Sequence, residues 1–510
     1  MRWESPHTAP QVIVTTPNRG LGLPAACEEK IMRVRNLERL LECAVTAVVA
    51  IAGSGSASEA AAAEPALVIY PEPAAVTYKK HNNDFTVRVR APQGPWRDLY
   101  EYNVKVDLNA PQNASMVYFD MTGPVEVSVR KNNGTVHEVR VRPSSAGIKV
   151  NVAGSIATFT LKEPRKLSVE FDGDRLHNLH ILASPLETDP PDPSDPNVVW
   201  FGPGVHQPED ASDAYHIASN KTVYIAGGAV VRGRLVLDHV ENVKILGRGI
   251  IDEPEEGIEI HYSKAITIDG PIVVNPRHYT VSCGQSSDIT IRNLKTFSAS
   301  PWSDGLDFMS CSQVRVDDVF LRTSDDCIAI YGHRWDFRGD ARDYLITHSI
   351  LWADVAHPIN IGLHGDPSEH GETLENIRFQ DIDILEHDEH NPDYRGAMAI
   401  SDGDDNLVRN IVFDSIRVDD FLEGELVNLR VVFNPKYNTA PGRGIENILF
   451  RNVTYSGANQ YVSVIAGYDA ARTVRDVRFE HLIINGRRID SARAANIDIG
   501  EHVSDVTFRP

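Results

Sequence analysis

The sequence reads Ser-Asp-Gly-Leu-Asp-Phe at 303–308 and Thr-Ser-Asp-Asp-Cys-Ile-Ala-Ile at 323–330. Asp304 therefore precedes Asp325 and Asp326 by 21 and 22 residues. The chain on both sides repeats a short β motif at a similar interval. If each repeat is one turn of a solenoid, residues one turn apart stack in neighbouring rungs, about 4.8 Å apart. The spacing predicts that three carboxylates face each other on one wall of the protein.

The repeated motif consists of a polar residue, an aliphatic residue, any residue, and an aliphatic or aromatic residue. Its clear copies begin at Asn242, Ala265, Asp288, Gln313, Asn376, Asn410, Asn447, Asp476 and Asp505, and a weaker copy lies near Tyr344. A short period with no helical pattern between copies predicts an all-β fold, a right-handed parallel β-helix over 198–510. The longer later repeats predict loops inserted on the binding face. A Greek-key β protein is the competing interpretation, which nine copies of one motif disfavour.

The chain before the solenoid has a different pattern. Residues 66–186 alternate apolar and polar side chains in short runs such as Val125-Glu-Val-Ser-Val, separated by turns such as Asn132-Asn-Gly. This pattern predicts a small antiparallel β-sandwich. Residues 187–197 are rich in proline and acidic residues, and they are expected to form an interdomain linker.

The first 65 residues have the composition of a targeting segment. Met32 begins a charged stretch, an apolar run follows from Leu40 to Gly53, and small residues continue to Ala63. This order is typical of a secretory signal, and the apolar run is short for a membrane span. We expect translation to start at Met32, which makes 1–31 an extension, and we expect cleavage near Ala63 to release a secreted protein with no membrane attachment. A disordered tail is the alternative.

Composition excludes some partners. The 510 residues include 50 basic and 71 acidic side chains, a net charge of −21. This charge disfavours nucleic acid and anionic membranes, and mildly disfavours a polyanionic substrate. After signal cleavage three cysteines remain, so at most one disulfide forms, and Cys311 and Cys327 are either bridged or stacked as free thiols on adjacent rungs. No cysteine and histidine cluster suggests zinc, and no metal or cofactor is predicted.

A family resemblance rests on these motifs and on His-Pro-Ile-Asn-Ile-Gly at 357–362. Over roughly 198–480 the chain resembles the polygalacturonases of glycoside hydrolase family 28 and the dextranases and isopullulanases of family 49, which belong to one clan. A β-sandwich before the helix is a feature of the dextranases. The resemblance implies a hydrolase that inverts configuration while cleaving a polysaccharide or oligosaccharide, with carboxyl groups roughly 6.5–9.5 Å apart.

The same resemblance implies roles for single residues. Asp325 corresponds to the general acid that protonates the leaving oxygen, while Asp304 and Asp326 correspond to the pair that positions and deprotonates water. We expect Asp325 to be neutral, because the other two crowd it, and we expect Asp304 and Asp326 to be ionised. His357 corresponds to the histidine that polygalacturonases keep near the acid, with a structural role as the alternative. Other predicted substrate-binding residues are Trp302, Asp307, Tyr331, Arg334, Trp335, His364 and Arg395. Aromatic faces stack on sugar rings, whereas Trp352 is expected to pack in the core, and Asp307 is expected to be a supporting or turn residue.

One departure concerns the substrate. Polygalacturonases hold the substrate carboxylate with Arg-Ile-Lys, but here the corresponding strand reads Gly396-Ala-Met-Ala-Ile-Ser, with Met398 and Ile400 in place of the cations. The loss of charge-assisted bonds predicts a neutral glycan and a dextranase-like activity. Arg334, Arg338 or Arg395 would have to substitute for these cations if the substrate were pectin, so a polygalacturonase stays an alternative.

Two other functions stay open. A β-helix polysaccharide lyase would need a uronate and a basic proton abstractor, and would release an unsaturated product. A binding solenoid would use the aspartates as turn caps and leave the polymer unchanged. A calcium site formed by Asp402, Asp404 and Asp405 is less expected than a solvated loop. The sequence does not indicate the sugar, its linkage, endo or exo action, or the oligomeric state.

Overall fold

The computed structural model describes residues 66–73, 80–209, 212–368, 370–458 and 461–510. The predicted signal segment lies outside the described residues. From Ala62 to Pro510 the chain clusters into one compact unit. Among the described residues, no helix has the length and apolar character needed to cross a bilayer.

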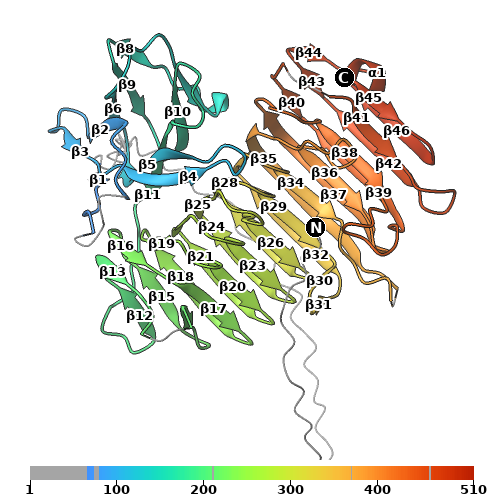
Figure 1. The fold of residues 1–510 in the computed structure, drawn as a ribbon, viewed down its shortest axis with the longest axis horizontal. Helices are drawn as coiled ribbons and strands as arrows, with labels where there is room; N and C mark the ends of the chain where they lie inside the picture. Colours follow the sequence, from blue (N-terminus) through green and yellow to red (C-terminus); the bar gives the residue numbers. More distant parts are fainter. Residues whose placement is uncertain (1–65, 74–79, 210–211, 369, 459–460) are drawn as a thin grey trace, which may run out of the picture. The chain divides into compact units, whose positions relative to one another are not determined.

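Two sheets form the first part of the fold (Figure 1). Their strands are β1 (Ala66–Val68), β2 (Phe85–Arg90), β3 (Arg97–Asp98), β4 (Tyr102–Val106), β5 (Gln112–Thr122), β6 (Val125–Lys131), β7 (Val139–Arg142), β8 (Asn151–Ala153), β9 (Ile156–Leu161), β10 (Lys166–Phe171) and β11 (Leu179–Pro185). Alternate residues such as Val87 of β2 and Phe119 of β5 face a shared apolar core. The predicted antiparallel sandwich is confirmed with one exception, because β5 and β11 pair in parallel.

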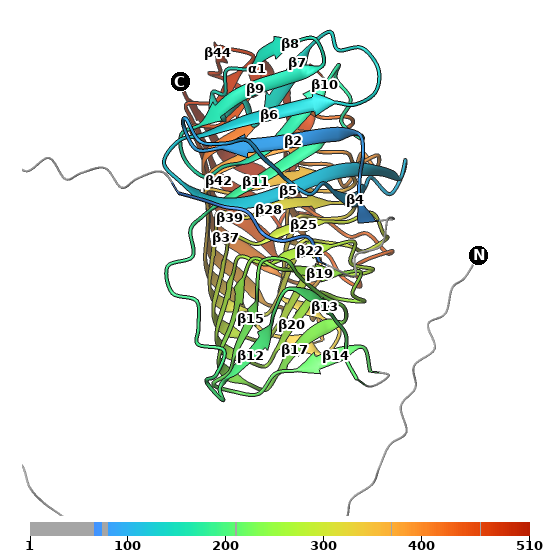
Figure 2. The ribbon, with the colours of Figure 1, turned by 90° about the vertical axis from the view of Figure 1, so that its left-hand side faces the viewer.

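The second part is the predicted right-handed parallel β-helix, whose strands stack rung upon rung in Figures 1 and 2. The larger sheet contains β12 (Val198–Phe201), β13 (Gly204–His206), β15 (Thr222–Ile225), β16 (Ala229–Val231), β18 (Glu241–Gly247), β19 (Ile250–Asp252), β21 (Lys264–Asp269), β22 (Ile272–Val274), β24 (Ser287–Arg292), β25 (Lys295–Phe297), β27 (Ser312–Asp317), β28 (Phe320–Thr323), β32 (Ala341–Thr347), β33 (Ile350–Ala353), β35 (Thr373–Glu386), β37 (Leu407–Val418), β39 (Gly444–Arg451), β40 (Thr454–Tyr455), β42 (Val474–Glu480), β43 (Ile483–Ile484), β44 (Arg487–Arg488) and β46 (Val503–Arg509).

A smaller parallel sheet forms another face of the solenoid and carries the candidate site. Its strands are β14 (Ala214–His216), β17 (Arg234–Asp238), β20 (Ile258–His261), β23 (Val281–Gly284), β26 (Leu306–Met309), β29 (Ile328–Tyr331), β34 (Ile359–Gly362), β36 (Met398–Asp402), β38 (Val427–Val431), β41 (Ser463–Ala466) and β45 (Ile497–Ile499). A hairpin of β30 (His333–Arg334) and β31 (Phe337–Arg338) follows β29, and the helix α1 (Ala492–Ala495) precedes β45.

The polar residue that opens each repeat adopts a left-handed backbone conformation. Its φ is 55° at Asn242, 57° at Asn376 and 54° at Asn447. Asparagine and aspartate tolerate this region better than other residues with a Cβ, which explains why the motif begins with them. The asparagines also bond to each other across rungs, since Asn447 Nδ2 donates to Asn410 Oδ1 at 2.8 Å. Their side chains thus form a ladder along the solenoid.

The last residue of the motif stacks inside the solenoid. Phe379, Phe413, Phe450, Phe479 and Phe508 form one column, with ring centroids 5.4, 4.9, 4.8 and 4.7 Å apart. These distances are close to the strand spacing of a β-sheet. Together with the buried aliphatic second residue, such as Ile377, the motif therefore provides two inward side chains per rung.

The cysteines differ from the expected pairing. Cys283, Cys311 and Cys327 are all buried free thiols. The pair in contact is Cys283 and Cys311, whose Sγ atoms are 2.8 Å apart, while Cys327 instead contacts Thr323 Oγ1 at 3.1 Å. The expected contact between Cys311 and Cys327 is wrong, because Cys311 follows β26 whereas Cys327 precedes β29, so the two residues lie at opposite ends of adjacent strands.

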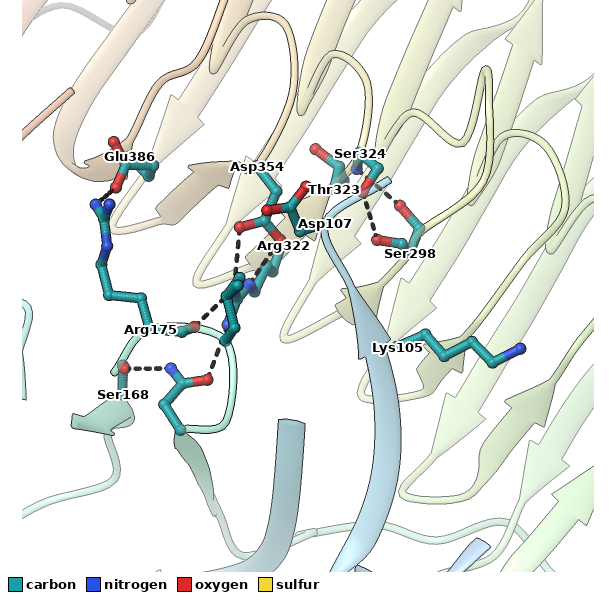
Figure 3. A network of polar contacts seen from close by, with 12 residues as sticks. Lys105, Asp107, Ser168, Arg175, Ser298, Arg322, Thr323, Ser324, Asp354 and Glu386 are labelled. Atoms are coloured by element: carbon teal, nitrogen blue, oxygen red, sulfur yellow. Dashed lines mark hydrogen bonds and ion pairs between the residues drawn. The ribbon is translucent and has the colours of Figure 1, made fainter. Parts of the chain in front are cut away.

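Buried polar contacts join the sandwich to the solenoid (Figure 3). Arg322 of β28 binds both carboxylate oxygens of Asp354 at 2.8 and 2.9 Å. The same guanidinium donates to Asn178 Oδ1 and to the carbonyl of Arg175, both at 2.9 Å. Trp352 packs flat against it at 3.9 Å and is buried, as expected for a core residue. The sandwich is therefore fastened beside the strand that leads to Asp325.

Candidate active site

Three carboxylates meet where neighbouring strands of the smaller sheet begin. Asp304 comes just before β26, and Asp325 and Asp326 come just before β29. Leu306 of β26 pairs in register with Ile328 of β29, so the turns that precede these strands stack. One oxygen from each of the three carboxylates lies within 4.8 Å of the others. Like charges at this range disfavour each other, so the three groups cannot all be ionised without compensation.

Asp326 has that compensation. His357 donates from Nδ1 to Asp326 Oδ1 at 2.7 Å, and Asn360 Nδ2 donates to Oδ2 at 2.8 Å. Burial would raise the pKa of Asp326, but His357 and these bonds outweigh it and lower the pKa. Burial would lower the pKa of His357, but Asp326 raises it to about 9. The pair is therefore an imidazolium and a carboxylate. His357 is fully buried and holds Asp326 in place, rather than lying beside Asp325.

Asp325 is the most exposed member of the trio. Burial, followed by the charge of Asp326, raises the pKa of Asp325 to about 7. Its Oδ1 accepts one bond, from the backbone N–H of Asp326 at 3.1 Å. A carboxyl group that is protonated in mildly acidic solution and reaches the surface can transfer a proton to a bound molecule.

Asp304 differs from its expected state. Burial, together with Asp307, Asp325 and Asp326, raises the pKa of Asp304 well above the usual value. The pKa of Asp307 is also raised well above the usual value by burial and by Asp326, and neither of its oxygens has a hydrogen-bond partner. Of the three carboxyl groups, Asp326 alone is thus favoured as an anion, whereas two anions were expected.

The closest approach of the carboxylates is between single oxygens. One oxygen of each carboxylate lies within 4.8 Å of the others, whereas the roughly 6.5–9.5 Å expected of an inverting pair is the separation of whole carboxyl groups. A water molecule forms hydrogen bonds of about 2.8 Å, so it can bridge two oxygens at this distance. The trio therefore has room for a water held between two carboxylates.

Aromatic and cationic side chains lie around the trio. Trp302 and Trp335 are 62% and 48% exposed, while Tyr331 is buried. Arg334 donates to His364 Nε2 at 2.5 Å, and burial together with this cation lowers the pKa of His364 to about 3. A cavity of about 500 Å³ is lined by His333, Arg334, Trp335, His364, Gly365, Asp366, Pro367, Ser368, Asp404, Tyr437 and Thr439. Trp335, an exposed tryptophan that lines this cavity, can stack on a ring-shaped ligand.

Arg395 has a different role from the one expected. Its guanidinium donates to the carbonyls of Glu389 and His390 at 2.9 and 3.1 Å and pairs with Glu423. It also lies over the ring of Tyr461 at 4.2 Å. These contacts use its Nε and Nη2 donors, so we interpret Arg395 as a residue that holds the loop before β36 and not as a ligand contact.

Met398 and Ile400 also point away from the site. Both are fully buried and belong to the core of the solenoid. Ala399, between them, pairs in register with Asn360, the residue that binds Asp326. Ala399 therefore faces the site, and it carries no charge. The assignment of Met398 and Ile400 to the cationic positions is wrong, but the residue that does face the site is not cationic either.

Several site residues escaped the sequence analysis. Asn360 bonds both Asp326 and the hydroxyl of Tyr394, and the carbonyl of Tyr394 accepts from His357. Tyr279 stacks on Trp335 with centroids 5.6 Å apart. Asn360 was detectable, because it is the one polar residue between two buried isoleucines of a strand. The tyrosines lie in irregular segments with no periodic signal.

The acidic loop at 402–405 has a structural role. Asp404 Oδ1 accepts bonds from the N–H groups of Thr439 and Ala440 at 2.6 and 3.0 Å, and Asp402 Oδ2 accepts from Gly444 at 2.9 Å. Neither of these two carboxylates is solvated. A role in capping the backbone of the next rung therefore replaces both the calcium site and the solvated loop. Within the described residues, two groups are close enough to hold an ion, namely the Asp304 trio and Asp388 with His390 and Glu423.

Comparison with known proteins agrees with this geometry. The family described as "Glycosyl hydrolases family 28" matches residues 235–504, which include the trio. No curated protein matches the chain. Among solved structures, Dex49A from Penicillium minioluteum is 14% identical, with a TM-score of 0.56, over 86% of this chain and 96% of its own. The family 28 exopolygalacturonase of Yersinia enterocolitica is 10% identical, with a TM-score of 0.44, over 76% of this chain and 97% of its own. At this identity the likeness to Dex49A concerns the fold alone.

Proposed function

The chain belongs to the glycosyl hydrolases family 28, and we propose that it is a secreted, inverting enzyme that cleaves a neutral polysaccharide with Asp325 as acid and Asp326 as base. Its general activity is that of a glycoside hydrolase acting on polysaccharides. The assignment rests on the pKa values of two adjacent carboxyl groups, which are shifted in opposite directions. The pKa of Asp325 is raised to about 7, whereas that of Asp326 is lowered. Pairs of groups with pKa values pushed apart identify an acid and a base.

In this proposal the reaction proceeds in one displacement. Asp325 donates its proton to the leaving glycosidic oxygen, while Asp326 removes a proton from the attacking water. The buried His357 keeps Asp326 ionised until that proton arrives. Asp304 is protonated in the resting protein. It holds the water against Asp326, and the two carboxyl groups share the proton of Asp304. Water attacks the face opposite the leaving group, so the product has inverted configuration.

The neutral substrate is supported by Ala399, which faces the site on the strand that corresponds to the cationic strand of the polygalacturonases. Among the described residues, Arg395 donates from Nε and Nη2 to the loop before β36, and Arg334 donates to His364. A uronate would therefore find no preformed charged fork on that strand. The positive charge of Arg334 acts to lower the pKa of both Asp304 and Asp307, and this is the observation that favours pectin as the second candidate.

A substrate panel tests this choice. Purified enzyme is incubated with dextran, pullulan, polygalacturonate, arabinan and fructan, and the release of reducing sugar is measured. We expect a neutral polymer to be cleaved faster than polygalacturonate by roughly tenfold or more, since a hydrogen bond to a charged group is worth about 1.5–3 kcal/mol. Faster cleavage of polygalacturonate would show that Arg334 replaces the missing fork. An unsaturated product would indicate a lyase, and unchanged but bound polymer would indicate a binding protein.

Secretion is proposed from the charged, apolar and small-residue order between Met32 and Ala63. Sequencing the N-terminus of the protein recovered from the culture medium tests it. An intact terminus on protein that stays inside the cell would refute it.

A further inference from the structure

Three buried serines connect the turns that carry the carboxylates. Ser298 Oγ donates to the carbonyl of Ser303 at 2.7 Å, and it accepts from the N–H of Ser324 at 3.1 Å. Ser324 Oγ donates to the carbonyl of Ser298 at 2.9 Å (Figure 3). Ser303 directly precedes Asp304, and Ser324 directly precedes Asp325. One hydroxyl therefore lies between the backbone of the two carboxylate turns.

The sandwich contributes the last hydrogen bond of this series. The N–H of Leu108, in the turn between β4 and β5, donates to Ser324 Oγ at 3.0 Å. This turn is itself held by Asp107, whose Oδ1 accepts from the N–H groups of Asn109 and Ala110 at 2.9 and 3.0 Å. Ser324 Oγ thus accepts one bond from the sandwich and donates one to the solenoid. The contact reaches the residue next to Asp325.

These contacts serve geometry more than stability alone. Ser298 and Ser303 are fully buried and Ser324 is 1% exposed, so water cannot replace a lost bond. The turns they join place three carboxylates within 4.8 Å against their mutual repulsion. A small change in separation at such a site alters both proton affinity and the fit of the attacking water.

We propose that Ser298 is a positioning residue which, together with Ser324, sets the separation of Asp304 and Asp325 and ties it to the β4–β5 turn of the sandwich. The expected effect on catalysis rests on the proposed function. The expected effect on the distance between Asp304 and Asp325 rests on the hydrogen bonds alone. It gives the sandwich a part in organising the active site, although it contributes no catalytic residue.

Kinetics of Ser298→Ala test the catalytic part, on whichever polymer of the panel is cleaved fastest. We expect kcat to fall roughly 100-fold with little change in KM, since displaced reacting groups lower the rate more than the binding. The decline of activity at high pH, set by Asp325, should move to lower pH. Asp304, Asp326 and His357 face Asp325, but burial is the largest cause of its raised pKa, and a displaced turn that admits water weakens the effect of burial. An unchanged kcat or an unmoved pH profile would overturn the proposal.

Ser286→Ala is the matched control. Ser286 is a buried serine in the turn between β23 and β24, and it accepts from the N–H of Ser263 at 2.9 Å and donates to the carbonyl of Gly284 at 2.8 Å. It touches neither carboxylate turn. Both variants should lower Tm by a similar amount, while only Ser298→Ala lowers kcat. An equal loss of kcat in the control would mean that general loosening explains the effect, and would overturn the proposal.

Two further measurements test the link and the geometry. Ser324→Ala should lower kcat roughly tenfold, and adding it to Ser298→Ala should lower kcat little further, because the two residues act as one unit. If the losses of kcat in the two single variants multiply in the double variant, the link between the two serines is overturned. Crystal structures of the wild type and Ser298→Ala compare the Asp304 to Asp325 distance without substrate. A changed distance supports the proposal even if the wild type cleaves no polymer, in which case only the proposed function fails, and an unchanged distance overturns it.

Discussion

Replacing Asp325 by Asn is expected to slow hydrolysis of the polymer by roughly 10³-fold and to slow an aryl glycoside with a good leaving group by only about tenfold. The variant keeps the shape of the side chain but removes the transferable proton. A sugar alkoxide leaves poorly without that proton, whereas an activated phenolate does not need it. Steady-state rates on both substrates measure the difference.

Asp402→Asn is the control for this variant. Asp402 is also a buried aspartate with a raised pKa, but its carboxylate caps Gly444 of another rung. Its replacement should leave both rates near the wild-type values. If Asp325→Asn slows the activated substrate as much as the polymer, the assignment of Asp325 as the acid is wrong.

Replacing Asp326 by Asn is expected to slow both substrates together, by roughly 10³-fold, because attack by water is needed whatever the leaving group. Asp326 is the carboxylate that His357 and Asn360 keep ionised. No neighbouring carboxyl group can therefore accept the proton of the water in its place. Asp304→Asn should also slow both substrates, but less, since Asp304 is favoured in its neutral form. The comparison uses the same two substrates, with Tm recorded for each variant.

A larger loss in Asp304→Asn than in Asp326→Asn would identify Asp304 as the base instead. An effect of Asp326→Asn confined to the polymer would give Asp326 a share in protonating the leaving group. The loss of the buried partner of His357 is also expected to lower Tm, because an imidazolium left in the core is unfavourable.

The repeats of this chain were visible in its sequence for a physical reason. Each rung needs inward aliphatic or aromatic side chains and a residue that tolerates a positive φ. Residues of the same types as Phe379 and Asn376 therefore recur at equivalent positions along the solenoid. The convergence of Asp304, Asp325 and Asp326 follows from the same period. Local pattern and global fold coincide in a repeat protein, because each repeat contacts mainly its neighbours.

The errors concern features that the period does not determine. Met398 and Ile400 were matched to the cationic positions of the polygalacturonases, although apolar residues at alternate positions of a strand indicate the buried face. The contact between Cys283 and Cys311 depends on which end of a strand each residue occupies. The protonation of Asp304 depends on burial and on the exact separation of its neighbours, which only the folded chain provides.

The long connections were the least predictable part. Tyr394 and Arg395 lie in an extended segment before β36, and their contacts with His357 and Glu423 arise from loop conformation. The serine contacts between Ser298 and Ser324 join residues 26 positions apart, and the contact to Leu108 spans 216 positions. Such contacts carry no signal in local sequence.

The stereochemistry of the first product tests the central claim most directly. The account requires a single displacement in which Asp326 deprotonates water and Asp325 protonates the leaving group, although their oxygens lie within 4.8 Å. Proton NMR of the polymer digest, recorded before mutarotation, shows the anomeric configuration of the newly released sugar. We predict inversion. Retention would contradict the account, and would mean that one of these aspartates forms a covalent bond to the sugar.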